Sequence, residues 1–157
     1  MRWMLATLAA LSLAGSATAA PADPERAAVI AAAQQFFDGM AANDVKRMSE
    51  VTLPDTMYAS VRRNPDGTTT VRQTPQRQFL EHAASGDKYL ERMWDPVVTR
   101  RGALAVIWAP YEFQLNGKTT HCGIDVFNMV KADGAWKVAS LTWTTEPDGC
   151  AELKAKP

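Results

Sequence analysis

The side chains best suited to do chemistry are Glu112, His121 and Asp125, all in the last third of the chain. Carboxylates and imidazoles are the commonest general acids and bases of enzymes. Asn-Gly at 116–117 predicts a two-residue hairpin loop, and pairing outward from it places Glu112 opposite His121 and Trp108 opposite Asp125. A carboxylate directly across from an imidazole would orient the ring and raise its pKa. We therefore take Asp125, His121 and Glu112 as candidate catalytic residues.

Pro110 leaves the orientation of this strand open. Proline inside a strand favours an edge strand or a β-bulge, because it cannot donate a hydrogen bond to its neighbour. With regular pairing, Glu112 faces the same side as His121. With a bulge, Tyr111 takes that side in place of Glu112, so the sequence alone does not decide between them.

Asp125 is the most informative candidate, because a carboxylate on the inner face of a sheet needs partners. The sequence offers Arg92, Thr142 and Tyr111. A structural hydrogen bond is the favoured interpretation, ahead of ligand contact. A carboxylate paired with Arg92 would indicate a binding or structural role, and one with a raised pKa and no arginine partner would indicate an enzyme. His121 is more simply interpreted as a hydrogen-bonded pocket histidine.

Aromatic side chains near these residues could wall an apolar pocket, although aromatic residues in strands more often belong to the core. The predicted ligand pocket consists of Trp94, Trp108, Tyr111, His121, Asp125 and Phe127. The expected ligand is a small, largely apolar molecule.

Two hairpins must position these side chains. The apolar and polar residues alternate on both sides of Asn-Gly at 116–117 and of Asp-Gly at 133–134. Both dipeptides tolerate the positive φ of a type I′ turn, so three long antiparallel strands are predicted. The second loop predicts the pairs Met129 with Val138, Phe127 with Ser140, and Asp125 with Thr142.

This register divides the side chains between two faces of the sheet. The face toward the first helix would carry Asp125, Phe127, Met129, Trp136 and Val138. The opposite face would carry Ile124, Val126, Val130, Ala139, Leu141 and Trp143. The second set is more apolar surface than a water-exposed sheet face normally shows, so we expect a homodimer through it, with coverage by the C-terminal tail as the alternative.

The first half of the chain predicts helices and a strand arm. Asp23-Pro24 starts a helix whose apolar stripe includes Val29, Ala33, Phe36 and Met40. Asn43 can end it in a left-handed conformation, and Asp44 can cap a short second helix. A hairpin arm at 57–61 and 68–74, a third helix from Pro75 to Gly86, and a strand from Tyr89 to Arg100 follow. Helices segregated from an antiparallel sheet indicate an α+β fold.

The N-terminus predicts export. Residues 1–19 begin with Met-Arg, continue with an apolar run and end in Ala-Thr-Ala, which is typical of a signal peptide cleaved after Ala19. The domains are then a signal peptide, 1–19, and one domain, 20–157, in a secreted or periplasmic protein with no membrane insertion after cleavage. In an oxidising compartment the only two cysteines, Cys122 and Cys150, are expected to form a disulfide, with two buried thiols as the alternative.

Composition excludes several classes of protein. The 17 basic and 17 acidic residues are spread without long runs, so nucleic acid is not expected as a partner. The two histidines, His82 and His121, do not form a metal-ligand pattern. No nucleotide-binding loop is present, and we expect no cofactor.

Several runs resemble the nuclear transport factor 2-like superfamily, closest to its bacterial secreted members and the putative lumazine-binding group. The resemblance covers residues 24 to about 145. The matching pieces are Phe36-Phe37, Glu91-Arg92 with Trp94-Asp95-Pro96, 108–113, 121–127 and 133–138. It implies a cone-shaped α+β barrel, in which a strongly curved antiparallel sheet packs on a long N-terminal helix and encloses a pocket, often in a dimer.

The resemblance leaves the function open, because this superfamily contains isomerases, cyclases, dehydratases and proteins that only bind. The leading hypothesis is an exported small-molecule-binding protein. The first alternative is an enzyme of the isomerase, dehydratase or cyclase type, with Asp125 or Glu112 as the base and Tyr111 or His121 as the proton donor. The second is a non-catalytic interaction module, which a pocket filled by its own side chains would favour.

Overall fold

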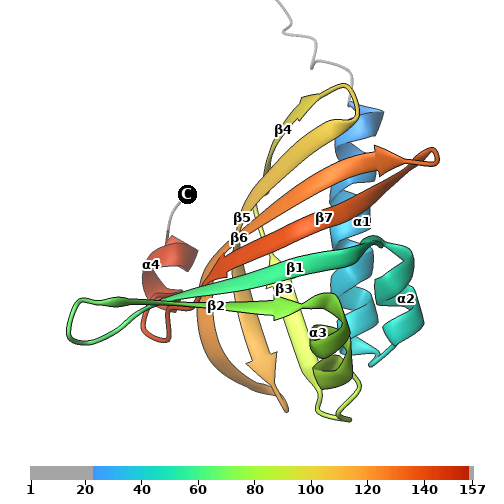
Figure 1. The fold of residues 1–157 in the computed structure, drawn as a ribbon. Helices are drawn as coiled ribbons and strands as arrows, with labels where there is room; N and C mark the ends of the chain where they lie inside the picture. The colour runs from blue at the N-terminus through green and yellow to red at the C-terminus, as the bar shows by residue number, and fades with distance from the viewer. Residues whose placement is uncertain (1–22, 156–157) are drawn as a thin grey trace, which may run out of the picture.

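A curved seven-stranded sheet packs around the long helix α1 in the computed structural model, which describes residues 23–155 (Figure 1). The helices are α1 (Pro24–Ala41), α2 (Val45–Glu50), α3 (Gln76–Ala83) and α4 (Cys150–Ala155). The strands are β1 (Thr52–Arg63), β2 (Thr69–Pro75), β3 (Tyr89–Met93), β4 (Val97–Arg101), β5 (Leu104–Leu115), β6 (Lys118–Ala132) and β7 (Ala135–Thr144). The expected signal peptide lies outside the described residues.

The sheet confirms the predicted α+β class and corrects two details of it. Its strand order is β2-β1-β7-β6-β5-β3, and β4 also pairs with β5. The sheet is open, so the predicted barrel does not close. It is also mixed, because β1 runs parallel to β7. No hairpin joins these two strands, and local sequence patterns therefore do not show their pairing.

The predicted single strand from Tyr89 to Arg100 is two strands. Asp95 has a φ of 44° and is followed by Pro96, and this pair of residues interrupts the extended backbone. Both β3 and β4 then pair with β5. Because of this break, β3 pairs with one end of β5 and β4 pairs with its other end (Figure 1).

Helix α1 begins and packs as its sequence predicts. The Asp23 side chain accepts a hydrogen bond from the Glu25 backbone N–H at 3.0 Å, which caps the helix. The apolar stripe is buried, and Phe37 lies edge-on to Phe127 of β6 with 5.5 Å between ring centroids. Glu25 also accepts hydrogen bonds from Lys131 at 2.8 Å and Trp136 at 3.0 Å, which fix the start of α1 to the β6–β7 hairpin.

A bulge near the Asn-Gly turn changes the register between β5 and β6. Leu115 still pairs with Lys118, as predicted, but Thr120 has no partner and the register shifts between Phe113 and Gln114. His121 therefore lies opposite Phe113, and the prediction that it lies opposite Glu112 is wrong. The alternative in which Tyr111 turns inward is correct, although the bulge lies at the turn and not at Pro110.

A second bulge changes the register between β6 and β7. Met129 pairs with Val138, as predicted, but Asn128 pairs with Ser140, which leaves Ala139 as the extra residue. The pairs expected for Phe127 and Asp125 are wrong, since their partners are Leu141 and Trp143. Leu141 and Trp143 consequently face α1, and not the outer surface as the sequence predicted.

The C-terminal segment is joined to the sheet by a disulfide. Cys122 of β6 and Cys150 at the start of α4 are bonded, with 5.0 Å between their Cα atoms. Lys154 of α4 also contacts Glu112 of β5 at 2.9 Å. No helix within residues 23–155 has both the length and the apolar content needed to cross a membrane.

Candidate ligand pocket

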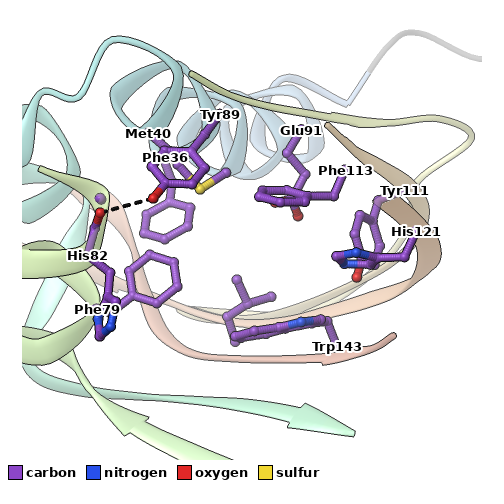
Figure 2. A pocket seen from close by; sticks show the side chains of 12 residues that line it. Phe36, Met40, Phe79, His82, Tyr89, Glu91, Tyr111, Phe113, His121 and Trp143 are labelled. Atoms are coloured by element: carbon purple, nitrogen blue, oxygen red, sulfur yellow. Dashed lines mark hydrogen bonds between the residues drawn. The ribbon is translucent and has the colours of Figure 1, made fainter. Parts of the chain in front are cut away.

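A cavity of about 220 Å³ lies between the curved sheet and the ends of α1 and α3. Its walls are mainly aromatic (Figure 2). The lining residues are Phe36, Met40, Phe79, His82, Ala83, Tyr89, Glu91, Tyr111, Phe113, His121, Leu141 and Trp143. A cavity of roughly 150 Å³ lined by apolar side chains holds one benzene molecule, so this one has room for a ligand of one or two rings.

Three neighbouring strands supply one wall of the cavity. Glu91 of β3 pairs with Phe113 of β5, and Phe113 pairs with His121 of β6, so these three side chains form one row on the inner face. Trp143 of β7 forms the wall across from Glu91 (Figure 2). The row exists because the bulge at Thr120 brings His121 into register with Phe113.

Tyr111 is held against the cavity wall by its backbone neighbours. Its ring lies over Gly123, where a Cβ atom would come within 2.8 Å of the ring and 2.0 Å of the Thr144 carbonyl oxygen. Its hydroxyl donates a hydrogen bond to that carbonyl oxygen at 2.8 Å. Burial, with the nearby acidic groups, raises the pKa of Tyr111, so the phenol stays protonated. The Tyr111 proton is therefore already engaged within the protein.

Asp125 lies behind the cavity wall and forms a pair with Glu91. Its side chain is 0% exposed, and neither of its carboxyl oxygens accepts a hydrogen bond from an N–H or hydroxyl group in the described part of the chain. The acidic group that acts on it is the Glu91 carboxyl. Two carboxyl groups can share a hydrogen bond only when one of them is protonated.

The pKa values of both carboxyl groups are raised. Burial, the charge of Glu91 and the hydrogen bond between them raise the pKa of Asp125 well above its usual range. Burial also raises the pKa of Glu91, to about 7, while the hydrogen bond from Asp125 works in the opposite direction. Glu91 is the member of the pair that faces the cavity, and its pKa of about 7 places its ionisation near neutral pH.

His121 contributes a neutral imidazole to the wall. Its Nδ1 lies 2.8 Å from the Thr120 hydroxyl, and its ring lies edge-on to Tyr111, with 5.7 Å between ring centroids. Burial, together with the positive charge of Arg62, lowers the pKa of His121. Among residues 23–155, no acidic side chain is hydrogen-bonded to this ring, so the predicted dyad of His121 and Glu112 does not form.

Four residues of the predicted site lie elsewhere. Trp108 points outward with 54% of its surface exposed, and Trp94 is half-buried but does not line the cavity. Phe127 is buried in the core against α1. Glu112 faces away from the cavity toward α4, where hydrogen bonds from Thr119 and Lys154 lower its pKa, so it is not a pocket base.

The sequence reasoning missed Glu91, which does line the cavity. A signal for it was available, because Tyr89, Glu91 and Met93 alternate along β3 and must share a face. An acidic residue between two apolar ones on an inner face indicates a buried carboxyl group. Phe113 and Trp143 were missed because their orientation depends on the two bulges. No three His, Cys, Asp or Glu side chains in the described ranges are placed to hold a metal ion.

The chain shares its fold with solved structures described as NTF2-like proteins or as having a cystatin-like fold. Residues 24–144 match the family model described as putative lumazine-binding. The chain belongs to that family. A search of curated protein sequences finds no match.

Solved structures share the fold at low sequence identity. One is an NTF2-like protein of unknown function from Shewanella baltica OS155, with 17% identity, a TM-score of 0.59 and coverage of 80% of this chain and 96% of that one. A second, described as the β subunit of a putative aromatic-ring-hydroxylating dioxygenase from Novosphingobium aromaticivorans, has 12% identity, a TM-score of 0.63 and coverage of 78% and 90%.

A third is described as a putative calcium/calmodulin dependent protein kinase II association domain from Xanthomonas campestris. Its identity is 21%, its TM-score is 0.61, and the match covers 88% of this chain and 99% of that one. At these identities the similarity shows the fold alone.

Proposed function

We propose that this protein binds a small, largely apolar molecule of one or two rings in the cavity. The observation that carries the proposal is an aromatic-walled cavity that the protein's own side chains leave open. An interaction module without a ligand has no need of such a space. The family description supports a fused-ring heterocycle such as lumazine as one compound to test.

Binding can be tested by isothermal titration with lumazine, naphthalene derivatives and simple benzene derivatives. The decisive variant is Ala83→Leu, because Ala83 is buried at the cavity wall and the added atoms would occupy ligand space. We expect about a ten-fold loss of affinity or more, the usual consequence of a steric clash in a packed site. The matched control is Ala84→Leu, one position along and exposed, which should bind normally. The proposal fails if no compound binds to the wild-type protein.

We also propose that the mature protein works after export. The Cys122–Cys150 disulfide supports an oxidising compartment. The intact mass of protein recovered from the periplasm of an expressing bacterium tests this directly. A mass beginning at Ala20 would agree with the proposal, and a mass that includes Met1 would contradict it.

A second candidate function is proton transfer, as in an isomerase, dehydratase or cyclase. The observation that favours it is Glu91, a cavity carboxyl with a pKa of about 7 and, in the part of the chain that the structure describes, no arginine or lysine beside it in the cavity lining. A base titrating near neutral pH is suited to abstract a proton from carbon. Glu91 replaces Asp125 and Glu112 as the proposed base, and His121 is the remaining donor because Tyr111 is engaged with Thr144.

This second function is tested with 2-tetralone, a two-ring ketone with acidic C–H groups, in deuterated water. Faster exchange of its α-protons with the wild-type protein than with Glu91→Gln would support proton transfer. Equal exchange rates in both samples and in buffer would leave binding as the function.

A further inference from the structure

Among the described residues, the charged side chains at the cavity are acidic and lack a basic counterpart. Within the described residues, the lining contains one carboxyl group, Glu91, and neither lysine nor arginine. The second carboxyl, Asp125, lies directly behind the first. Burial lowers the pKa of His121, so this ring adds no positive charge near neutral pH. An ionised Glu91 therefore faces the ligand space without a cationic partner at the wall.

The remaining charged and titratable neighbours do not reverse this imbalance. Tyr111 on β5 stays protonated, and Glu146 after β7 adds negative charge near it. Arg62 of β1 acts on His121 but is itself exposed to solvent. The Nδ1 atom of His82 lies 2.6 Å from the Gln78 carbonyl oxygen and so carries a proton that it donates within α3.

The aromatic walls, like an ionised Glu91, attract positive charge. Phe36 stacks on Phe79 with 5.8 Å between ring centroids, and Phe79 lies edge-on to Trp143 at 6.4 Å. Tyr89 and Phe113 are 6.0 Å apart on the other side. The faces of aromatic rings are electron-rich and attract cations, and an aromatic cage with a carboxylate is a recurrent solution for binding ammonium groups. Figure 2 shows these rings and Glu91 around one space.

Asp125 makes Glu91 a better acceptor for such a ligand. A hydrogen bond from Asp125 lowers the pKa of Glu91 and so favours its ionised form. A protonated amine bound to the other side of Glu91 would complete the hydrogen bonds of a half-buried carboxylate. A ligand carboxylate at the same place would meet an uncompensated like charge.

We infer that the cavity recognises a protonated amine on a one- or two-ring apolar body, with the ammonium group on Glu91 and the ring among the aromatic walls. This inference rests on the proposed binding function and names the chemical class of its ligand. A neutral or anionic molecule of the same size would bind more weakly.

Three probes of nearly equal size test the inference: benzylamine, benzyl alcohol and benzoate, titrated by calorimetry or by ligand-observed NMR. At about pH 8, where Glu91 is ionised and the amine is still protonated, we expect benzylamine to bind about ten-fold more tightly than benzyl alcohol and benzoate to bind weakest. At about pH 5.5, where Glu91 is protonated, the preference for the amine should largely disappear.

Two variants assign the preference to Glu91. Glu91→Gln should bind benzylamine no more tightly than benzyl alcohol, because it no longer offers a carboxylate to the ammonium group. Glu112→Gln removes a carboxylate that lies outside the cavity and should keep the full preference. A cooperative urea-unfolding transition of Glu91→Gln shows that the variant is folded.

The outcomes separate this inference from the function on which it rests. Equal binding of the three probes, or a preference for benzoate, would overturn the amine inference and leave the binding function intact. A ten-fold preference that survives Glu91→Gln would overturn it as well. If none of these probes and none of the larger ring compounds binds, the binding function itself is wrong.

Discussion

At the scale of single residues, the Glu91–Asp125 pair should control how stability depends on pH. The pKa of Glu91 rises from 4.5 to about 7 on folding, so the folded protein keeps a proton that the unfolded chain loses between these values. Stability from this group is fully present below about pH 4.5 and is lost as the pH rises toward 7. The raised pKa of Asp125 acts in the same direction.

Glu91→Gln should therefore flatten this dependence. We expect the fall in unfolding free energy between pH 5 and pH 7 to become shallower by roughly 1 kcal/mol per pH unit, somewhat less than the value of about 1.4 kcal/mol for one full proton. Urea unfolding at three pH values measures it. Glu112→Gln is the control. Folding lowers the pKa of Glu112 from 4.5, so the stability from this group is present above about pH 4.5 and is lost only in more acidic solution. Parallel curves for wild type and Glu91→Gln would show that the carboxyl pair is not formed.

Gly123 should tolerate no side chain. A Cβ atom there would lie 2.0 Å from the Thr144 carbonyl oxygen, so β7 or the Tyr111 ring would have to move. We expect Gly123→Ala to cost roughly 3 kcal/mol of unfolding free energy. Gly117→Ala is the comparison, since the turn has open space and only its φ of +79° is unfavourable, which costs roughly 1 kcal/mol. Equal losses of unfolding free energy in the two variants would mean that Thr144 and Tyr111 lie farther from Gly123 than the structure shows.

At the scale of elements, the disulfide should stabilise the fold and hold α4 near β6. It joins residues 28 positions apart, and a loop of this length corresponds to roughly 3.5 kcal/mol of stabilisation in the chain-entropy account. Chemical unfolding with and without reductant measures the difference. A Cys122→Ala, Cys150→Ala double variant should resemble the reduced protein and ignore the reductant. Unchanged wild-type stability after complete reduction would contradict this expectation.

The two β-bulges are the elements on which the site depends. Each adds one residue to a strand, and one residue reverses which face every later side chain occupies. The first places Tyr111 and Phe113 inward and Glu112 outward. The second turns Trp143 into the cavity. The two bulges therefore decide which of the candidate side chains line the cavity.

At the scale of the whole molecule, the homodimer stays a prediction. The outer sheet face has lost Leu141 and Trp143 to the cavity but still exposes Val97 by 62%, Leu104 by 55% and Trp108 by 54%. An apolar face of this kind is typical of a symmetric contact between two copies. Light scattering at micromolar concentration should give the mass of a dimer, and Trp108→Asp should convert it to a monomer without reducing its stability. A wild-type monomer would refute the dimer.

The sequence by itself determined the local structure. The capped helix at Asp23, the left-handed Asn43 and both two-residue turns are fixed by short-range sterics and hydrogen bonding, and they stand where predicted. The alternation of apolar and polar residues also identified the buried face of β6, which carries Asp125, Phe127 and Met129. The match of Cys122 with Cys150 followed from compartment and chain direction and is present in the structure.

Only the tertiary structure decided which side chains meet in the cavity. The parallel pairing of β1 with β7 and the pairing of β3 with β5 join segments that no tight turn connects, so their registers are set by packing around α1. Glu91 reached Asp125 through these long-range contacts, and Glu112 and Trp108 were turned outward by a bulge. Non-local packing selects one register among several that the local pattern allows, and here that selection replaced the predicted acid–base residues with the Glu91–Asp125 pair.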